Sequence, residues 1–140
     1  MDDIKFELYG PAIQDHELSE AQWKGIYEES YRRIEQHLRK GESVVRDSGN
    51  FTRRERADVR EIANKLGLTT VTIFVDTPPA IAHQRLLENR SAQTRLDVTG
   101  EDWQEIIDVM EPPTAEEHAL IFRYGNTVDD WIERNLHVFK

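Results

Sequence analysis

Apolar side chains recur at helical spacing between residues 19 and 41. Ser19 is followed three residues later by Gln22, which is the capping-box pattern that opens a helix. The apolar face that follows consists of Trp23, Tyr27, Ile34 and Leu38. Gly41 stands where the pattern stops, and glycine commonly follows the last residue of a helix. The pattern predicts a long amphipathic helix that ends before Gly41.

Short β-branched runs and a second helical pattern occupy the next part of the chain. The run SVVRD, residues 43–47, is typical of a short strand, and TTVTIFVD, residues 69–76, is typical of a buried strand. Between them, Thr52 with Glu55 forms another capping box. The predicted buried stripe of that helix is Val59, Ile62, Ala63 and Leu66. Strand, helix and strand of these lengths predict a right-handed βαβ unit with parallel strands.

More capped helices and one more strand follow. Helix starts are predicted at Thr77, Thr99 and Thr127, each followed by a proline or by an acidic capping partner. The run HALIFRY predicts a further strand near residues 119–124. A polar stretch predicts a lid loop at about 88–98. We therefore expect an α/β fold with a parallel sheet of about three strands flanked by helices.

The composition restricts the classes of function. The net charge is −9 with 32% charged residues, so the overall field repels polyanions, and duplex nucleic acid is not an expected partner. The chain has no cysteine, and its five histidines show no metal-binding spacing. No apolar run reaches the length of a membrane span, and the acidic N-terminus lacks the features of a secretory signal. We expect a cytoplasmic protein that does not bind membranes.

Acidic and amide side chains gather at the predicted carboxyl ends of strands. Asp47 ends one predicted strand and Asp76 ends the next, and ligands of parallel sheets bind at this edge. Each aspartate alone fits a turn or a helix cap equally well. However, Asn50 follows Asp47 across a turn at Gly49, and the chain opens with an acidic pair followed by Lys5. Together with the arginines near the lid loop, these features favour a ligand site.

Several stretches together carry a resemblance to a known family. They are DDIK, SVVRDSGNFTRRER, IFVDTPPAIAHQRLLENR, RLDVTGEDW and NTVDDW, which cover nearly the whole chain. As a set they resemble the small P-loop kinases of the AAA_33 type, relatives of polynucleotide 5′-kinase and of zeta-toxin-like proteins. The resemblance implies part of the three-layer P-loop NTPase fold, as a single kinase-like domain over residues 1–140. It also implies ATP and Mg²⁺ as cofactors, and a nucleotide and a hydroxyl-bearing acceptor as partners.

The resemblance assigns roles to residues in the first part of the chain. Asp2 matches the acid that takes the proton from the substrate hydroxyl, and Lys5 stands where an arginine usually holds the substrate. Asp47 matches the Walker B aspartate, which steadies magnesium through water. Asn50 and Arg53 match positions that bind the substrate.

The resemblance also assigns roles to residues in the second part of the chain. Arg85 and Arg90 match the catalytic arginines of the helix and lid, and Arg95 with Asn126 match nucleotide-binding positions. Such arginines fit phosphoryl transfer, which is catalysed by alignment and by neutralisation of charge on the phosphates.

The sequence departs from that family in one respect. No GxxxxGK[ST] phosphate loop occurs, and none of the seven glycines is followed by lysine. In the family this loop lies upstream of the acid matched by Asp2, so the chain resembles a member without its first strands and phosphate loop. Three explanations are a start at an internal methionine, a decayed relative with a binding role, and completion by another polypeptide. We favour the first, and we expect such a fragment to be inactive alone.

Other classes of function stay open. An aspartate after an apolar strand also opens the haloacid-dehalogenase phosphatases, but these need a second acid two residues later, where this chain has Gly49. A non-catalytic kinase-like binding or regulatory module is the main alternative, and it would bind a partner through an uncovered sheet edge.

The missing strands lead to an architectural expectation. Without a strand between them, residues 43–47 and 70–76 are expected to pair directly within a sheet of three strands. Helices that normally cover a wider sheet would then leave apolar surface exposed, so we expect a homo-oligomer or strand exchange.

Overall fold

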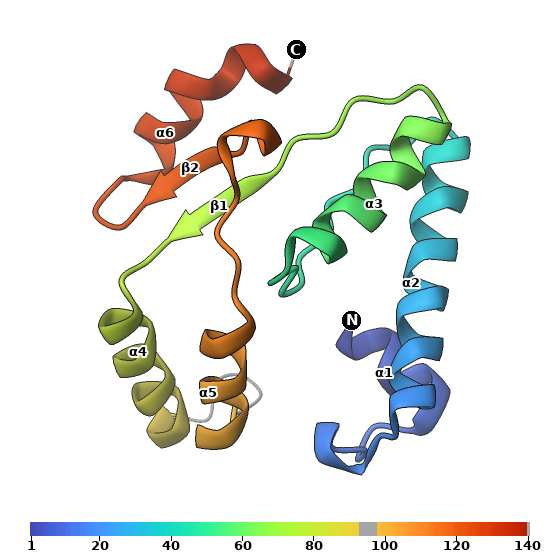
Figure 1. Ribbon diagram of the computed structural model, residues 1–140, viewed down its shortest axis with the longest axis vertical. Helices are drawn as coiled ribbons and strands as arrows, with labels where there is room; N and C mark the ends of the chain where they lie inside the picture. The colour runs from blue at the N-terminus through green and yellow to red at the C-terminus, as the bar shows by residue number, and fades with distance from the viewer. Residues whose placement is uncertain (93–97, 140) are drawn as a thin grey trace. The chain divides into compact units, whose positions relative to one another are not determined.

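The computed structural model describes residues 1–92 and 98–139 (Figure 1). The chain divides into two compact units, which are described separately: unit 1 is Met1–Asn50 with Arg54–Thr70, and unit 2 is Phe51–Arg53 with Val71–Lys140. The protein is mixed α/β, and its described strands form a small parallel sheet. A search of the described residues for a helix that could cross a membrane finds none.

Unit 1 is helical. Its elements are α1 (Asp2–Tyr9), η1 (Asp15–Glu17), α2 (Glu20–Arg39) and most of α3 (Arg53–Lys65). Helix α1 lies alongside α2 (Figure 1). The core of the unit is built from Ile4, Leu18 and Ile26, of which Ile26 is fully buried. Partly buried side chains at its border are Met1, Tyr9, Ile13 and Trp23.

The predicted capping box at the start of α2 is confirmed. Ser19 and Gln22 bond reciprocally: the Gln22 backbone N–H donates to the Ser19 hydroxyl, and the Ser19 N–H donates to the Gln22 side chain at 2.9 Å. Helix α2 ends at Arg39, and Gly41 has a φ of 79°, the left-handed conformation that glycine adopts without strain. The prediction of a helix that ends before Gly41 is therefore correct.

The prediction of a strand at residues 43–47 is wrong. The segment from 43 to 49 has no backbone-to-backbone hydrogen bond with any described residue and belongs to no strand. Side chains nevertheless alternate along it, with Arg46 and Ser48 partly buried and Val45 92% exposed. The segment thus keeps the period-2 pattern of a strand, but a strand exists only where a neighbouring strand accepts its hydrogen bonds.

Unit 2 contains the sheet. Strands β1 (Ile73–Asp76) and β2 (Leu120–Arg123) are parallel, in a register that pairs Ile73 with Leu120 and Asp76 with Arg123. The expected sheet of about three strands is therefore a sheet of two in the part of the chain that the structure describes. The other elements of the unit are α4 (Pro79–Ala92), α5 (Gly100–Val109), η2 (Ala115–Glu117), α6 (Val128–Asn135) and η3 (Leu136–Phe139). Residues 88–92 of the expected lid loop belong to α4, and 93–97 lie outside the described residues.

The outer edge of β2 is closed by side chains. Leu120 N and Tyr124 N donate to β1, so the peptide groups of Ile121 and Arg123 face away from it. The indole N–H of Trp131, on α6, donates to the Ile121 carbonyl at 2.8 Å, and the Asn126 side chain accepts from the Arg123 N–H at 3.3 Å. Both outward-facing residues of β2 thus have a side-chain partner.

The outer edge of β1 is open. Thr77 N donates to the Val75 carbonyl at 3.1 Å, but within the described residues the Ile73 N–H and C=O and the Val75 N–H have no partner. The side chains of Ile73 and Val75 are 46% and 61% exposed. The prediction that this strand is buried is therefore wrong, because no described element covers its face or its free edge.

Candidate functional site

Helix α1 places Asp2 and Lys5 one turn apart at the start of unit 1. The Lys5 side chain is only 4% exposed, and its Nζ lies 2.5 Å from Asp15 Oδ1 and 3.8 Å from Asp2 Oδ1. The ammonium also lies 4.8 Å from the centre of the Phe6 ring. Asp2 keeps a side chain that is 58% exposed. The lysine is thus already paired, whereas the Asp2 carboxylate is open to an incoming group.

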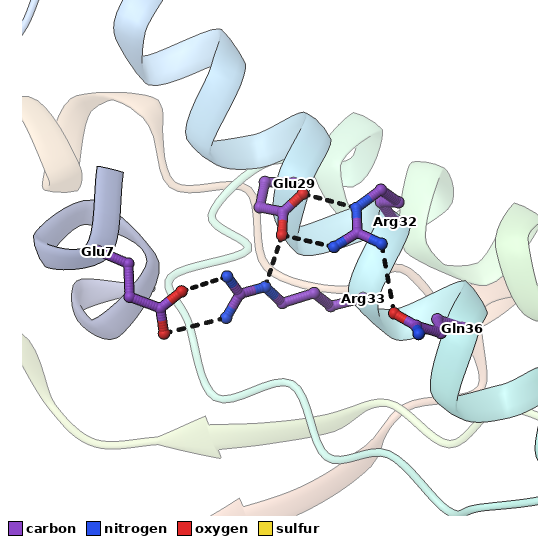
Figure 2. A network of polar contacts seen from close by, with 5 residues as sticks. All are labelled: Glu7, Glu29, Arg32, Arg33 and Gln36. Atoms are coloured by element: carbon purple, nitrogen blue, oxygen red, sulfur yellow. Dashed lines mark hydrogen bonds and ion pairs between the residues drawn. The ribbon is translucent and has the colours of Figure 1, made fainter. Parts of the chain in front are cut away.

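Arg33 links α1 to α2 (Figure 2). Its guanidinium donates to Glu7 of α1 and, through Nε at 2.7 Å, to Glu29 of α2. Glu29 also accepts two hydrogen bonds from Arg32, which reaches on to Gln36. The hydrogen bonds from Arg32 and Arg33 lower the pKa of Glu29 to about 2, and the hydrogen bond from Arg33 lowers the pKa of Glu7. This network holds the helix that carries Asp2.

A turn after the extended segment presents Asp47. Asn50 has a φ of 47°, a left-handed conformation that asparagine tolerates better than most residues, and its Nδ2 donates to the Ser48 carbonyl at 3.1 Å. The Asn50 carbonyl accepts from Nη1 of the buried Arg56 at 3.1 Å. Asp47 is exposed, and its carboxylate has no hydrogen bond or ion pair with a described residue. The turn therefore offers a free carboxylate to a ligand.

The predicted catalytic arginines lie in unit 2. Arg85 of α4 is exposed, with its guanidinium carbon 5.7 Å from the centre of the Tyr124 ring. Arg90 is exposed near the end of α4, and its Nη2 donates to the Val98 carbonyl. Arg95 lies outside the described residues. Both described arginines keep exposed guanidinium groups, which suits contact with an anion.

The two other predicted residues of unit 2 have local partners. The Arg53 side chain pairs with Glu116 at 2.7 Å, and its backbone N–H donates to Glu111 at 2.7 Å. Asn126 forms a turn with Arg123 through its backbone N–H and its side-chain oxygen. These contacts account for both residues structurally, and any contact with a substrate or nucleotide would have to replace or extend them.

Within the units, the structure brings some predicted residues together. Asp2 lies beside Lys5, and Asp47 is joined to Asn50 by one turn. Sequence reasoning missed Arg46, whose guanidinium carbon lies 5.2 Å from the Tyr31 ring centre and 5.9 Å from that of Tyr27. The stretch VVRDSGN contained a signal for the position of Arg46. In an extended segment successive side chains point to opposite sides, so Arg46 points inward where Asp47 points outward.

The site has limited means of holding a metal. Within residues 1–92 and 98–139, no cluster of three or more histidine, cysteine or acidic side chains could hold an ion by itself. Mg²⁺ in nucleotide sites is bound through one or two carboxylates, with waters and phosphate oxygens as further ligands. The unpaired carboxylate of Asp47 fits that arrangement, and the described residues do not form a complete metal cage by themselves.

Comparisons with known proteins give one match. No curated protein sequence and no solved structure is significantly similar to the chain. The family model for an AAA domain, AAA_33, matches residues 1–113, which is most of the chain. This family consists of P-loop NTPase-type domains that bind nucleotides, and the mixed α/β fold with a parallel sheet is consistent with part of that architecture. The chain therefore belongs to the AAA_33 family of AAA domains.

Proposed function

We propose that the protein is an ATP-dependent phosphotransferase of the small P-loop kinase type, acting on a hydroxyl acceptor. The observation that carries this proposal is the family match over residues 1–113, because P-loop NTPase domains bind nucleotide phosphates. The exposed, unpaired carboxylate of Asp47 supports it, since a magnesium-steadying aspartate must be accessible.

The acceptor side of the reaction is assigned to unit 1. Asp2 serves as general base for the acceptor hydroxyl, and its exposed side chain at the start of α1 suits that role. Lys5 holds this region through its contact with Asp2, and Asn50 orients the acceptor beside Asp47. Arg53 is the remaining acceptor-binding residue in the proposal.

The nucleotide side is assigned mainly to arginines. Arg85 and Arg90 neutralise charge on the transferring phosphoryl group, and Arg95 and Asn126 contact the nucleotide. Asp47 would hold Mg²⁺ through water, and the bound ion would supply neutralisation of phosphate charge. The 140 residues contain no GxxxxGK[ST] loop, and the backbone amides and lysine of such a loop supply most of the contacts to the β- and γ-phosphates.

The affinity of this chain for ATP tests the proposal. Because several charge-assisted hydrogen bonds are absent without a phosphate loop, we expect a dissociation constant for Mg·ATP of about 0.5 mM or weaker. A titration of ¹⁵N-labelled protein with ATP, with and without Mg²⁺, detects binding in this range and locates it. Amides near Asp47, Asn50, Arg85 and Arg90 should shift, and Asp47→Asn should remove the dependence on Mg²⁺.

Two results would contradict the proposal in different ways. No Mg²⁺-dependent shift at these residues at 10 mM ATP, which is roughly twenty times a dissociation constant of 0.5 mM, would refute nucleotide binding at this site. A low-micromolar dissociation constant for Mg·ATP would show that the chain forms a phosphate site without a GxxxxGK[ST] loop. Asp129→Asn is the matched control, because Asp129 is an exposed aspartate on α6 with no assigned role.

A second candidate function is a non-catalytic kinase-like binding or regulatory module. The open edge of β1 favours it, since an unpaired strand edge with exposed apolar side chains is a recognised site of strand addition. This candidate predicts that a peptide partner, and not Mg·ATP, shifts the amides of β1. The same labelled protein therefore distinguishes the two candidates.

A further inference from the structure

A pocket in unit 1 is lined by polar groups that, apart from Asp47, the proposed phosphotransfer does not use. It has a volume of about 270 Å³ and lies between the start of α1, one face of α2 and residues 44–47. Ile4 and Ile34 contribute apolar walls, and Ser30 and Arg46 contribute polar groups. The pocket therefore has room for a small organic ligand.

The Arg46 guanidinium is held in place without a counter-charge. It lies over the Tyr27 and Tyr31 rings, and its Nε and Nη1 are buried with no hydrogen-bond partner among the described residues. No carboxylate of the described chain forms an ion pair with it. A desolvated cation without an acceptor is unfavourable, so an anion that reaches it gains the interaction without having to displace a partner.

A second polar group of the pocket is also unpartnered. Ser30 is 6% exposed, and its hydroxyl makes no hydrogen bond with any described residue. Serine in a helix normally bonds to the preceding turn or to solvent, so the Ser30 hydroxyl in the pocket lining can bond to a ligand in place of water. Arg46 and Ser30 are thus two independent donors in the lining of one pocket.

The charges around the pocket limit the ligand to one negative charge. Arg33 also lines the pocket, but Glu7 and Glu29 already neutralise it (Figure 2). His37 contacts Glu42. The Asp47 carboxylate is part of the lining and repels further negative charge. The Arg46 cation beside the Asp47 carboxylate suits a monoanion better than a phosphate dianion.

We propose that this pocket binds a small monocarboxylate with a short apolar body, its carboxylate accepting from Arg46 and from the Ser30 hydroxyl. The apolar body lies against Ile4 and Ile34. The two tyrosine rings fix the orientation of the Arg46 guanidinium before the ligand arrives. The proposal does not depend on nucleotide binding or on catalysis.

The test is a titration of the ¹⁵N-labelled 140-residue chain with isovalerate, with isovaleramide as the neutral probe and inorganic phosphate as the dianionic one. Isovalerate should produce saturable shifts at Ser30, Ile34 and Arg46, and isovaleramide should bind at least tenfold more weakly. Arg46→Met should weaken isovalerate binding at least tenfold. Arg39→Met is the matched control, because Arg39 is an exposed arginine of α2 paired with Glu35, and it should bind as the wild type does.

Three outcomes would overturn the proposal. They are the absence of a saturable shift with isovalerate up to roughly 20 mM, equal binding of isovalerate by Arg46→Met, and tighter binding of phosphate than of isovalerate. If Arg46→Met loses its folded spectrum, Ser30→Ala decides the question. That variant removes only a hydroxyl, and it should keep the folded spectrum while weakening isovalerate binding at least threefold. Unchanged affinity in Ser30→Ala would then refute the proposal.

Discussion

Asp15→Ala tests whether the buried Lys5 ammonium depends on its closest carboxylate. The Lys5 side chain is 4% exposed, so water does not readily replace a lost partner, and Asp15 Oδ1 lies at 2.5 Å while Asp2 Oδ1 lies at 3.8 Å. A hydrogen bond to a charged group contributes about 1.5–3 kcal/mol, and the more distant Asp2 compensates only in part. We expect Asp15→Ala to lower the free energy of unfolding by about 2 kcal/mol.

Urea unfolding followed by circular dichroism measures this change. With a denaturant dependence of about 1–3 kcal/mol per molar urea, a loss of about 2 kcal/mol lowers the midpoint by roughly 1 M. Hydrogen exchange should show the loss of protection in α1 and in the first turns of α2. The residue Asp3 provides the control: it is exposed in the same helix, and Asp3→Ala should change stability by less than about 0.5 kcal/mol.

Lys5→Met tests the same ion pair by removing the cation instead of the carboxylate. This substitution removes the buried charge together with its need for a partner, and Asp15 remains 60% exposed and solvated. Replacing a buried ion pair by an apolar group is often close to neutral, so Lys5→Met should destabilise less than Asp15→Ala. A reversed order, or an Asp15→Ala variant within about 0.5 kcal/mol of the wild type, would show that the pair does not stabilise α1.

Two further predictions concern acid stability and assembly. Because the pKa of Glu29 is lowered to about 2 from its ordinary value near 4.5, its contribution to stability is complete above pH 4.5 and is lost as the pH falls toward 2. Glu29→Gln should therefore flatten the decline in the urea midpoint between pH 5 and 2, and an unchanged decline would contradict the assignment. At the open edge of β1 we propose pairing with a second copy: sedimentation velocity should show a dimer, and Val75→Lys should shift it to monomer. Val128→Lys, at an exposed valine of α6, is the control. A wild-type monomer at about 0.5 mM, a concentration above most dissociation constants of specific dimers, would refute the pairing.

Local signals in the sequence predicted the helices well. The capping boxes at Ser19 and Thr99 and the cap at Thr127 all form, because each depends on residues three apart and not on the rest of the fold. Helix α1 was not predicted, since DDIKFELY lacks a capping partner and a clear apolar face. Its position depends on burial of Ile4 against α2 and on the Arg33 network, neither of which is visible in eight residues of sequence.

Strands were harder to predict than helices for a physical reason. The β-branched composition of SVVRD is correct for a strand, but a strand requires hydrogen-bond partners from elsewhere in the chain, and residues 43–49 have none in the described structure. The run IFVD does form β1, because Leu120–Arg123 provides a partner. Its predicted burial fails because burial depends on neighbouring layers that composition does not specify.

In the candidate site, too, local features were predicted from the sequence and contacts between distant residues were not. The turn between Asp47 and Asn50 was predicted from local pattern, and the structure contains it. The pairing of Lys5 with Asp15 and the contact of Arg46 with two tyrosine rings depend on residues farther away in sequence or on faces that only packing defines. The sequence could therefore identify candidate side chains, but it could not show which of them already pair with other residues of the chain.

The unequal edges of the sheet in unit 2 also limit how far assembly can proceed. Trp131 and Asn126 occupy the Ile121 carbonyl and the Arg123 N–H on the outward side of β2, so that side offers fewer free backbone groups to another strand than β1 does. Pairing of β1 with β1 of a second copy uses the open edge of β1 and creates a symmetric interface. The product is a sheet of four strands with the partly occupied edges of β2 outermost, which disfavours growth beyond two copies along this direction.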